Sequence, residues 1–119
     1  MTELPDVIIE LSKKYKVSVE RSRFCDRNEG ASAGQDIFLG EFDDPDIEIV
    51  AFFHELGHCI SRESSKRRYT MCILSGEGHA WEVGLDVAFQ NGYKWDYYSK
   101  EMKWARGRLA TYVKNTHNF

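Results

Sequence analysis

The chain has 119 residues, of which 42% are hydrophobic and 29% charged, and its formal net charge is −3. This length fits a single domain spanning residues 1–119. The balanced charge excludes a polycationic protein of the histone kind. The longest uncharged apolar run covers residues 49–53, far short of the roughly 20 residues that a membrane helix needs, so we expect no membrane association.

The cysteines and the first residues bear on localisation. Three cysteines, Cys25, Cys59 and Cys72, form an odd set without a C-x-x-C pair, which is unusual for a small secreted domain. The first ten residues contain acids and a proline where a signal peptide has basic and apolar residues. We therefore expect a cytoplasmic protein.

The first part of the chain is predicted to form a helix and two strands. Apolar residues recur at helical spacing over residues 5–16. Residues 17–24 and 35–42 have the composition of strands, and they could form a hairpin or two neighbouring strands. Residues 26–34 between them are rich in turn-forming types and are predicted to be a loop.

The clearest helix is predicted from Pro45 to about Ser61. Asp44 is a good N-cap, and Pro45 suits the first helical position. One apolar stripe along this helix should face the core; it consists of Ile49, Phe53, Leu56 and Ile60.

Two further helices are predicted in the second half, over residues 79–90 and 96–114. The polar, basic stretch between the central helix and residue 79 is interrupted by residues 69–74, which form either a short strand or an ordered loop. Together the elements predict an α+β fold with three main helices packed on a short mixed or antiparallel sheet.

The central helix carries an H-E-x-x-H motif formed by His54, Glu55 and His58. Two histidines four residues apart share one helix face, so both imidazoles can reach a single Zn²⁺ ion. Glu55 is rotated by about 100° from His54, which places it beside the metal and not on it. There it can act as general base for the attack of water on a carbonyl group. We therefore predict a zinc site at His54 and His58 with Glu55 as a catalytic residue.

A catalytic zinc needs a third protein ligand. The metzincin continuation of the motif is excluded, because Ser61 and Ser64 stand where it requires glycine and histidine. Glu82 and Asp86 lie on one face of the next predicted helix; Glu82 is predicted as the third ligand, and Asp86 as the acceptor that orients a ligating histidine. His79 is a rival third ligand, and it could instead be a catalytic residue that polarises the substrate carbonyl.

A peptidase also needs a donor that steadies the oxyanion and groups that hold the peptide. Candidate donors are His79, Tyr69, Tyr93 and Tyr97. Residues 35–42 are the expected strand for main-chain pairing with a substrate.

A basic cluster, which includes Arg67, follows the central helix directly. It could bind an acidic substrate or partner, or it could be a solvated loop; its members are Arg62, Lys66, Arg67 and Arg68. Because the cluster lacks interleaved aromatic residues, we do not expect direct nucleic-acid binding.

The H-E-x-x-H motif followed by Glu82 and Asp86 resembles the gluzincin pattern of zinc metallopeptidases. The short chain and the sequence His-Glu-Leu-Gly-His at residues 54–58 resemble the ImmA/IrrE-type minimal zincins of phages and mobile elements. The resemblance covers roughly residues 35–90. It implies that His54, His58 and Glu82 bind zinc, that Glu55 is the general base, and that the substrate is a transcriptional repressor or a similar regulator.

The sequence thus predicts a zinc-dependent endopeptidase that acts on a protein substrate. The alternative is a non-catalytic protein of the same fold that binds and modulates a host or regulatory partner protein.

Overall fold

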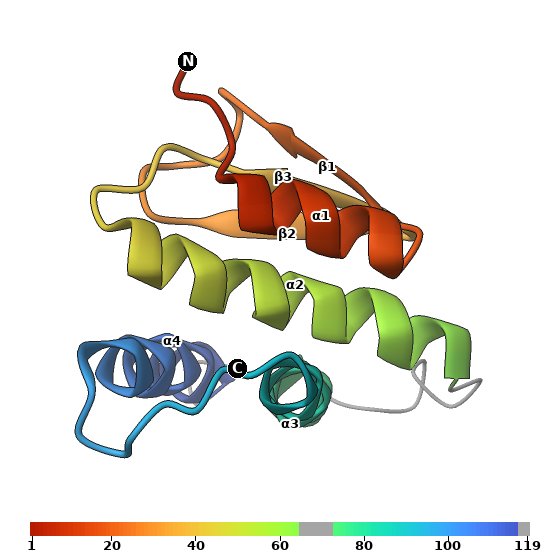
Figure 1. Ribbon diagram of the computed structural model, residues 1–119. Helices are drawn as coiled ribbons and strands as arrows, with labels where there is room; N and C mark the ends of the chain where they lie inside the picture. The colour runs from red at the N-terminus through yellow and green to blue at the C-terminus, as the bar shows by residue number, and fades with distance from the viewer. Residues whose placement is uncertain (65–72, 117–119) are drawn as a thin grey trace.

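A long central helix separates two layers of the molecule. The computed structural model describes residues 1–64 and 73–116. In it, α2 (Pro45–Ser64) lies between a layer made of α1 (Asp6–Lys14) and a small sheet, and a layer made of α3 (Ile73–Gln90) and α4 (Lys100–Thr116) (Figure 1). The predicted α+β fold, with helices packed on a short sheet, is confirmed.

The sheet is mixed and has three strands within the described part of the chain. They are β1 (Ser18–Arg21), β2 (Gly30–Ala33) and β3 (Asp36–Leu39), in the order β1-β3-β2. β3 pairs in parallel with β1 and antiparallel with β2. The two predicted strands therefore exist as neighbours, but β2 forms inside the segment predicted to be a loop, where that prediction is wrong.

The N-terminus of α2 follows the predicted capping chemistry. A side-chain oxygen of Asp44 accepts a hydrogen bond from the backbone N–H of Asp46 at 2.9 Å. Asp46 and Glu48 place negative charge in the first turn, where the helix dipole favours it. The N-cap prediction is thus confirmed, and the helix extends to Ser64, beyond the predicted end.

The core lies on both sides of α2. Phe52, Phe53 and Leu56 pack with Ile8 of α1 and Ile37 of β3 in the larger cluster of buried residues. A smaller cluster joins α2 to the other layer through side chains of α2, α3 and α4, namely Val50, Trp81 and Ala105. Because both layers cover α2, its middle turns, including the H-E-x-x-H motif, are almost wholly removed from solvent.

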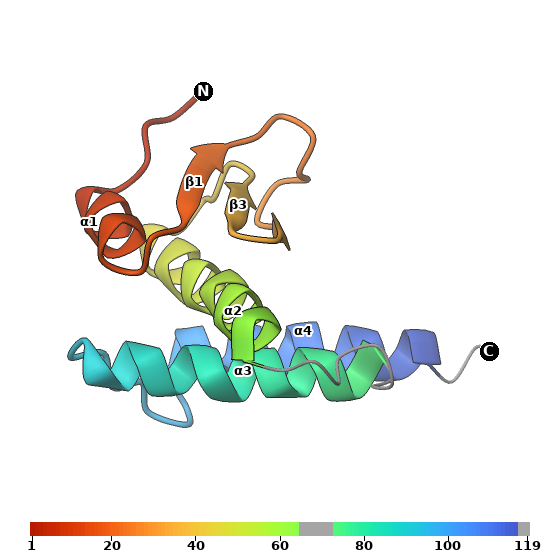
Figure 2. The same ribbon diagram turned by 90° about the vertical axis from the view of Figure 1, so that its right-hand side faces the viewer.

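Two glycines let α3 approach α2 closely. A β-carbon at Gly57 would collide with the carbonyl oxygen of Ala80, and one at Gly84 would collide with the carbonyl oxygen of Phe53. α3 and α4 then run side by side in opposite directions beneath α2 (Figure 2). α3 begins at Ile73, earlier than predicted, and α4 begins at Lys100, later than predicted.

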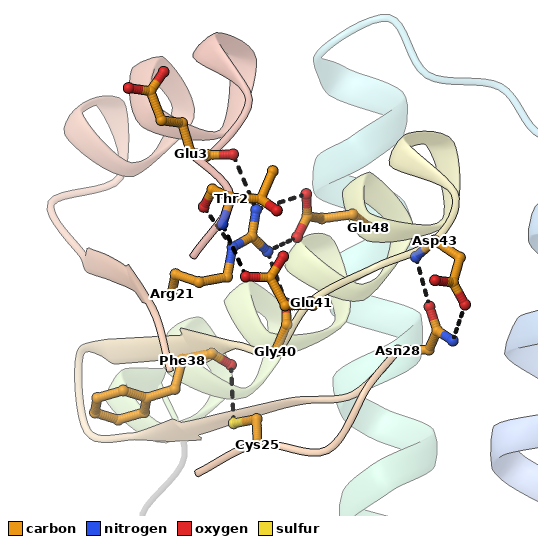
Figure 3. Close-up of polar contacts among 10 residues, drawn as sticks. All are labelled: Thr2, Glu3, Arg21, Cys25, Asn28, Phe38, Gly40, Glu41, Asp43 and Glu48. Atoms are coloured by element: carbon orange, nitrogen blue, oxygen red, sulfur yellow. Dashed lines mark hydrogen bonds and ion pairs between the residues drawn. The ribbon is translucent and has the colours of Figure 1, made fainter. Parts of the chain in front are cut away.

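A buried guanidinium group, that of Arg21, connects the N-terminal segment to the sheet and to α2 (Figure 3). Arg21 of β1 forms an ion pair with Glu48 of α2, and the two side chains are only 6% and 5% exposed. Arg21 also donates hydrogen bonds to the carbonyl oxygens of Thr2, Glu3 and Gly40, at 3.1, 3.1 and 2.7 Å. The buried charge is therefore compensated by a carboxylate and three carbonyls.

None of the helices in the described residues combines the length and the apolar character needed to span a membrane.

Candidate metal centre

His54 and His58 lie one turn apart on α2 and present their rings on the same side. Their ring centroids are 4.7 Å apart, with an angle of 74° between the planes. His54 is only 5% exposed, whereas the side chain of His58 is 15% exposed. The predicted spacing therefore brings both imidazoles to the border of one cleft.

The third member of this group is Glu77, which comes from α3. Its Oε2 atom lies 2.9 Å from Nε2 of His54 and 2.9 Å from Nε2 of His58. One ligand atom from each of these residues lies within 4.8 Å of the other two, so the group could hold a metal ion. Two imidazole nitrogens and one carboxylate oxygen form a donor set that suits catalytic zinc.

The helix face explains why Glu77 reaches the histidines. Glu77, Ala80 and Gly84 follow one another at i, i+3 and i+7, so they share a face of α3. Ala80 and Gly84 contact the backbone of α2 directly. The same face therefore places the Glu77 carboxylate against α2, about one helical turn before Ala80, where the two backbones touch.

The structure brings Glu77, and not Glu82, to the two histidines. Glu82 is exposed, and five residues along an α-helix separate it from Glu77 by about 140° around the axis. Asp86, the predicted acceptor for a ligating histidine, is also exposed and accepts a hydrogen bond from Gln90 at 3.2 Å. The signal for Glu77 in the sequence was its spacing from the small residues Ala80 and Gly84.

Burial and hydrogen bonding act in opposite directions on the Glu77 carboxyl. Burial raises its pKa, but the hydrogen bonds and positive charge of His54 and His58 outweigh burial and lower the pKa from 4.5 to about 2. Glu77 is therefore ionised at neutral pH, as a carboxylate that binds a cation must be.

Glu55 lies beside this group at the same cleft. Its Oε2 is 3.9 Å from Nε2 of His54, and the residue is 7% exposed. The cleft has a volume of about 240 Å³ and is lined by Glu55, the three members of the group and the β2 residues Gly30, Ala31 and Ser32. Glu55 thus has access to the space in front of the candidate ligands without belonging to their group.

The strand order corrects the prediction that residues 35–42 pair with a substrate peptide. Residues 35–42 contain β3, which is the central strand, and its two neighbours β1 and β2 already occupy both of its sides. The strand that lines the cleft is β2, at an edge of the sheet. Its sequence, Gly-Ala-Ser-Ala, has no β-branched or aromatic residue, so its composition gave no strand signal.

The other predicted site residues lie elsewhere or outside the described part of the chain. His79 is half-buried on α3 and is not a member of the ligand group. Tyr93 packs its ring against Phe53, at a centroid distance of 5.3 Å, and lines a separate apolar cleft. Tyr69 and Arg67 lie outside the described residues, as do the other basic residues of their segment, Lys66 and Arg68.

Comparison with protein families, curated proteins and solved structures finds no match for this chain. Its function must therefore be inferred from the ligand group, Glu55 and the cleft that they share.

Proposed function

We propose that this protein is a zinc-dependent endopeptidase. The observation that carries the proposal is the convergence of His54, His58 and Glu77 at one cleft with the Glu55 carboxylate beside them. The donor set and the acidic side chain next to it match what peptide hydrolysis by a metal site requires.

In this proposal His54, His58 and Glu77 hold the zinc ion. When bound, zinc supplies Lewis acidity, which polarises the peptide carbonyl and makes water a stronger acid. Glu55 takes up the proton that the attacking water releases, and it returns that proton to the nitrogen of the departing amine. Glu55 is buried and lines the cleft together with residues of β2 and α3, so its carboxylate is held at the cleft.

The substrate in this proposal is an extended segment of a protein. β2 lines the cleft and lies at an edge of the sheet, and an edge strand can pair with an extended peptide through its main chain. Gly30 of β2 passes close to Glu55, because a β-carbon there would lie 3.5 Å from Cγ of Glu55. A peptide laid along β2 would therefore run past the proposed base.

The resemblance to gluzincins and to ImmA/IrrE-type zincins supports the same chemistry, with Glu77 in place of Glu82 as the third ligand. A regulatory or repressor protein remains the proposed substrate class. The cytoplasm is the proposed compartment, since such regulators act there.

One observation favours the alternative of a non-catalytic binding protein. A larger cleft of about 390 Å³ lies away from the candidate ligands and is mainly apolar; its lining residues are Leu85, Phe89, Tyr93, Lys94, Trp95 and Met102. Phe89 is 58% exposed at this cleft, and exposed apolar surfaces of this kind commonly contact other proteins.

Glu55→Gln distinguishes the two candidates. We expect the variant to keep its zinc and its fold but to lose cleavage of a mixture of unfolded proteins, detected by mass spectrometry of new N-termini. Glu82→Gln is the matched control: it removes an exposed carboxylate of α3 and should leave both zinc content and cleavage unchanged. Full cleavage by Glu55→Gln would refute the peptidase proposal.

A further inference from the structure

Two buried nitrogen atoms beside the candidate metal centre have no hydrogen-bond partner among the described residues. They are Nδ1 of His54 and Nε1 of Trp81. The two residues are 5% and 4% exposed, respectively. Buried N–H groups are almost always hydrogen-bonded, because losing contact with water without a replacement costs free energy.

Both residues line the same small cavity, whose volume is about 20 Å³. One water molecule needs about 10–15 Å³ of such space and two to four polar partners. The cavity is also bordered by the carboxylate residues Glu29 and Glu55 and by Arg108, whose Nη1 lies 3.2 Å from Oε1 of Glu29. The walls therefore offer donors and acceptors around a space of the right size.

We propose that one buried water molecule occupies this cavity and completes the hydrogen bonding of His54. The water accepts hydrogen bonds from Nδ1–H of His54 and Nε1–H of Trp81, and it donates to the carboxylates of Glu29 or Glu55. A water molecule is neutral and offers two hydrogen-bond donors and two acceptors, which matches these partners. The inference is carried by the unpartnered nitrogens of two residues that line one cavity.

The water has a consequence for the metal centre, and this part rests on the proposed function. When zinc is bound, a hydrogen bond at Nδ1 would keep the proton of His54 on that nitrogen and leave the lone pair of Nε2 for the metal. Nε2 is the atom that lies 2.9 Å from Glu77. Trp81 is thereby a positioning residue that acts on the metal through His54.

The indole of Trp81 also fixes the plane of the imidazole. The two rings are stacked with centroids 4.2 Å apart and 23° between their planes. Trp104 contacts Trp81 edge-on, at 6.0 Å and 71°, and lines the same cavity, but its nitrogen is not one of the buried unpartnered atoms. Trp81→Phe therefore removes the N–H while keeping an aromatic face, and Trp95→Phe is a control of equal size at a tryptophan that does not line this cavity.

The first test is a crystal structure of the wild-type protein at a resolution that reveals ordered water, in metal-free and zinc-loaded form. We expect density for one water within hydrogen-bond distance of both nitrogens. A dry cavity in both forms would overturn the proposal, and this result does not depend on whether any variant folds. If the protein binds no zinc but the water is present, the proposed function fails while the water site stands.

The second test measures zinc affinity and the ring N–H proton of His54 by NMR in the loaded protein. Trp81→Phe should weaken zinc binding by about 10-fold, the lower end for outer hydrogen-bond partners of metal ligands. It should also speed the solvent exchange of the His54 ring proton, whereas Trp95→Phe, outside this cavity, should change neither. If Trp81→Phe and the control variant changed zinc affinity and proton exchange equally, Trp81 would act only through packing, and its role as a positioning residue would be refuted.

Discussion

Gly57 of α2 lies directly against the carbonyl oxygen of Ala80 in α3. No side chain separates the two backbones at this point, because even a β-carbon at Gly57 would collide with that oxygen. This contact fixes how closely α3 crosses α2, and with it the distance between Glu77 and the two histidines.

Gly57→Ala should therefore push the two helices apart. We expect a destabilisation of about 1–3 kcal/mol, as for overpacked cores, together with weaker zinc binding. Denaturant unfolding and zinc titration measure the two effects. Gly107→Ala in α4 is the control, because nothing lies within 4 Å of its added β-carbon. Its free energy of unfolding should rise by up to about 1 kcal/mol, since alanine has a higher helix propensity than glycine. Equal stability of Gly57→Ala and the wild type would contradict the close crossing.

Zinc should stabilise the protein through Glu77. Because the ligands come from two helices, binding favours the folded state, by about 2.7 kcal/mol at a zinc concentration 100 times the dissociation constant. The melting temperature should accordingly fall on addition of a chelator. Glu77→Gln should abolish most of this difference, whereas Glu82→Gln should retain it. A chelator response that depends on Glu82 and not on Glu77 would reverse the assignment of the third ligand.

Arg21→Met should be strongly destabilising. It leaves the Glu48 carboxylate buried without its partner, and breaking a buried pair in this way costs about 3–5 kcal/mol. The matched control is Arg27→Met, because Arg27 and Asp43 form an ion pair with side chains 64% and 63% exposed. Exposed pairs of this kind contribute little to stability, because water and salt screen the two charges. Urea unfolding of both variants measures the difference, and similar losses would show that the Arg21 pair is not buried in solution.

The thiol of Cys25 should react slowly at neutral pH. Burial raises its pKa above the usual 9.0, a hydrogen bond with Ser22 lowers it by less, and the negative charge of Glu55 adds to the increase. Because thiolate is the reactive form, the rate of alkylation by iodoacetamide should reach half its maximum only above pH 9.0, as measured by mass spectrometry of the Cys25 peptide.

The unfolded chain in urea is the control for Cys25, and it should react at lower pH than the folded protein. The folded state holds the thiol proton more tightly, so ionisation of the unfolded chain above pH 9.0 favours unfolding as the pH rises. If the alkylation rate of Cys25 in the folded protein reached half its maximum at or below pH 9.0, the raised pKa would be contradicted.

Local sequence patterns were sufficient for the elements that local chemistry determines. The cap at Asp44 and the apolar stripe of α2 predicted the helix that carries His54 and His58. The strand-like composition of residues 35–42 predicted β3, whose Ile37 and Leu39 side chains are buried in the core cluster shared with α2.

Elements determined by distant contacts could not be predicted in this way. β2 has no intrinsic strand preference and exists because it pairs with β3. The carboxylate that reaches the histidines depends on where α3 crosses α2, and this is set by Gly57 and Gly84 together. The small residues of α3 mark the face that carries Glu77, but they do not show where that face crosses α2, so the sequence predicts Glu82 as the third ligand.

The order of the layers along the chain also sets the order in which the site can be assembled during synthesis. The first layer and α2 lie within residues 1–64, and they leave the ribosome before α3 does. A single domain generally folds as a unit, so the site cannot form before α3 has emerged. A nascent chain at this stage has the two histidines and Glu55 but lacks the third ligand, which arrives only when α3 docks through its glycine contact. The proposed peptidase site is thus completed by the last of its ligands along the chain, Glu77 of α3.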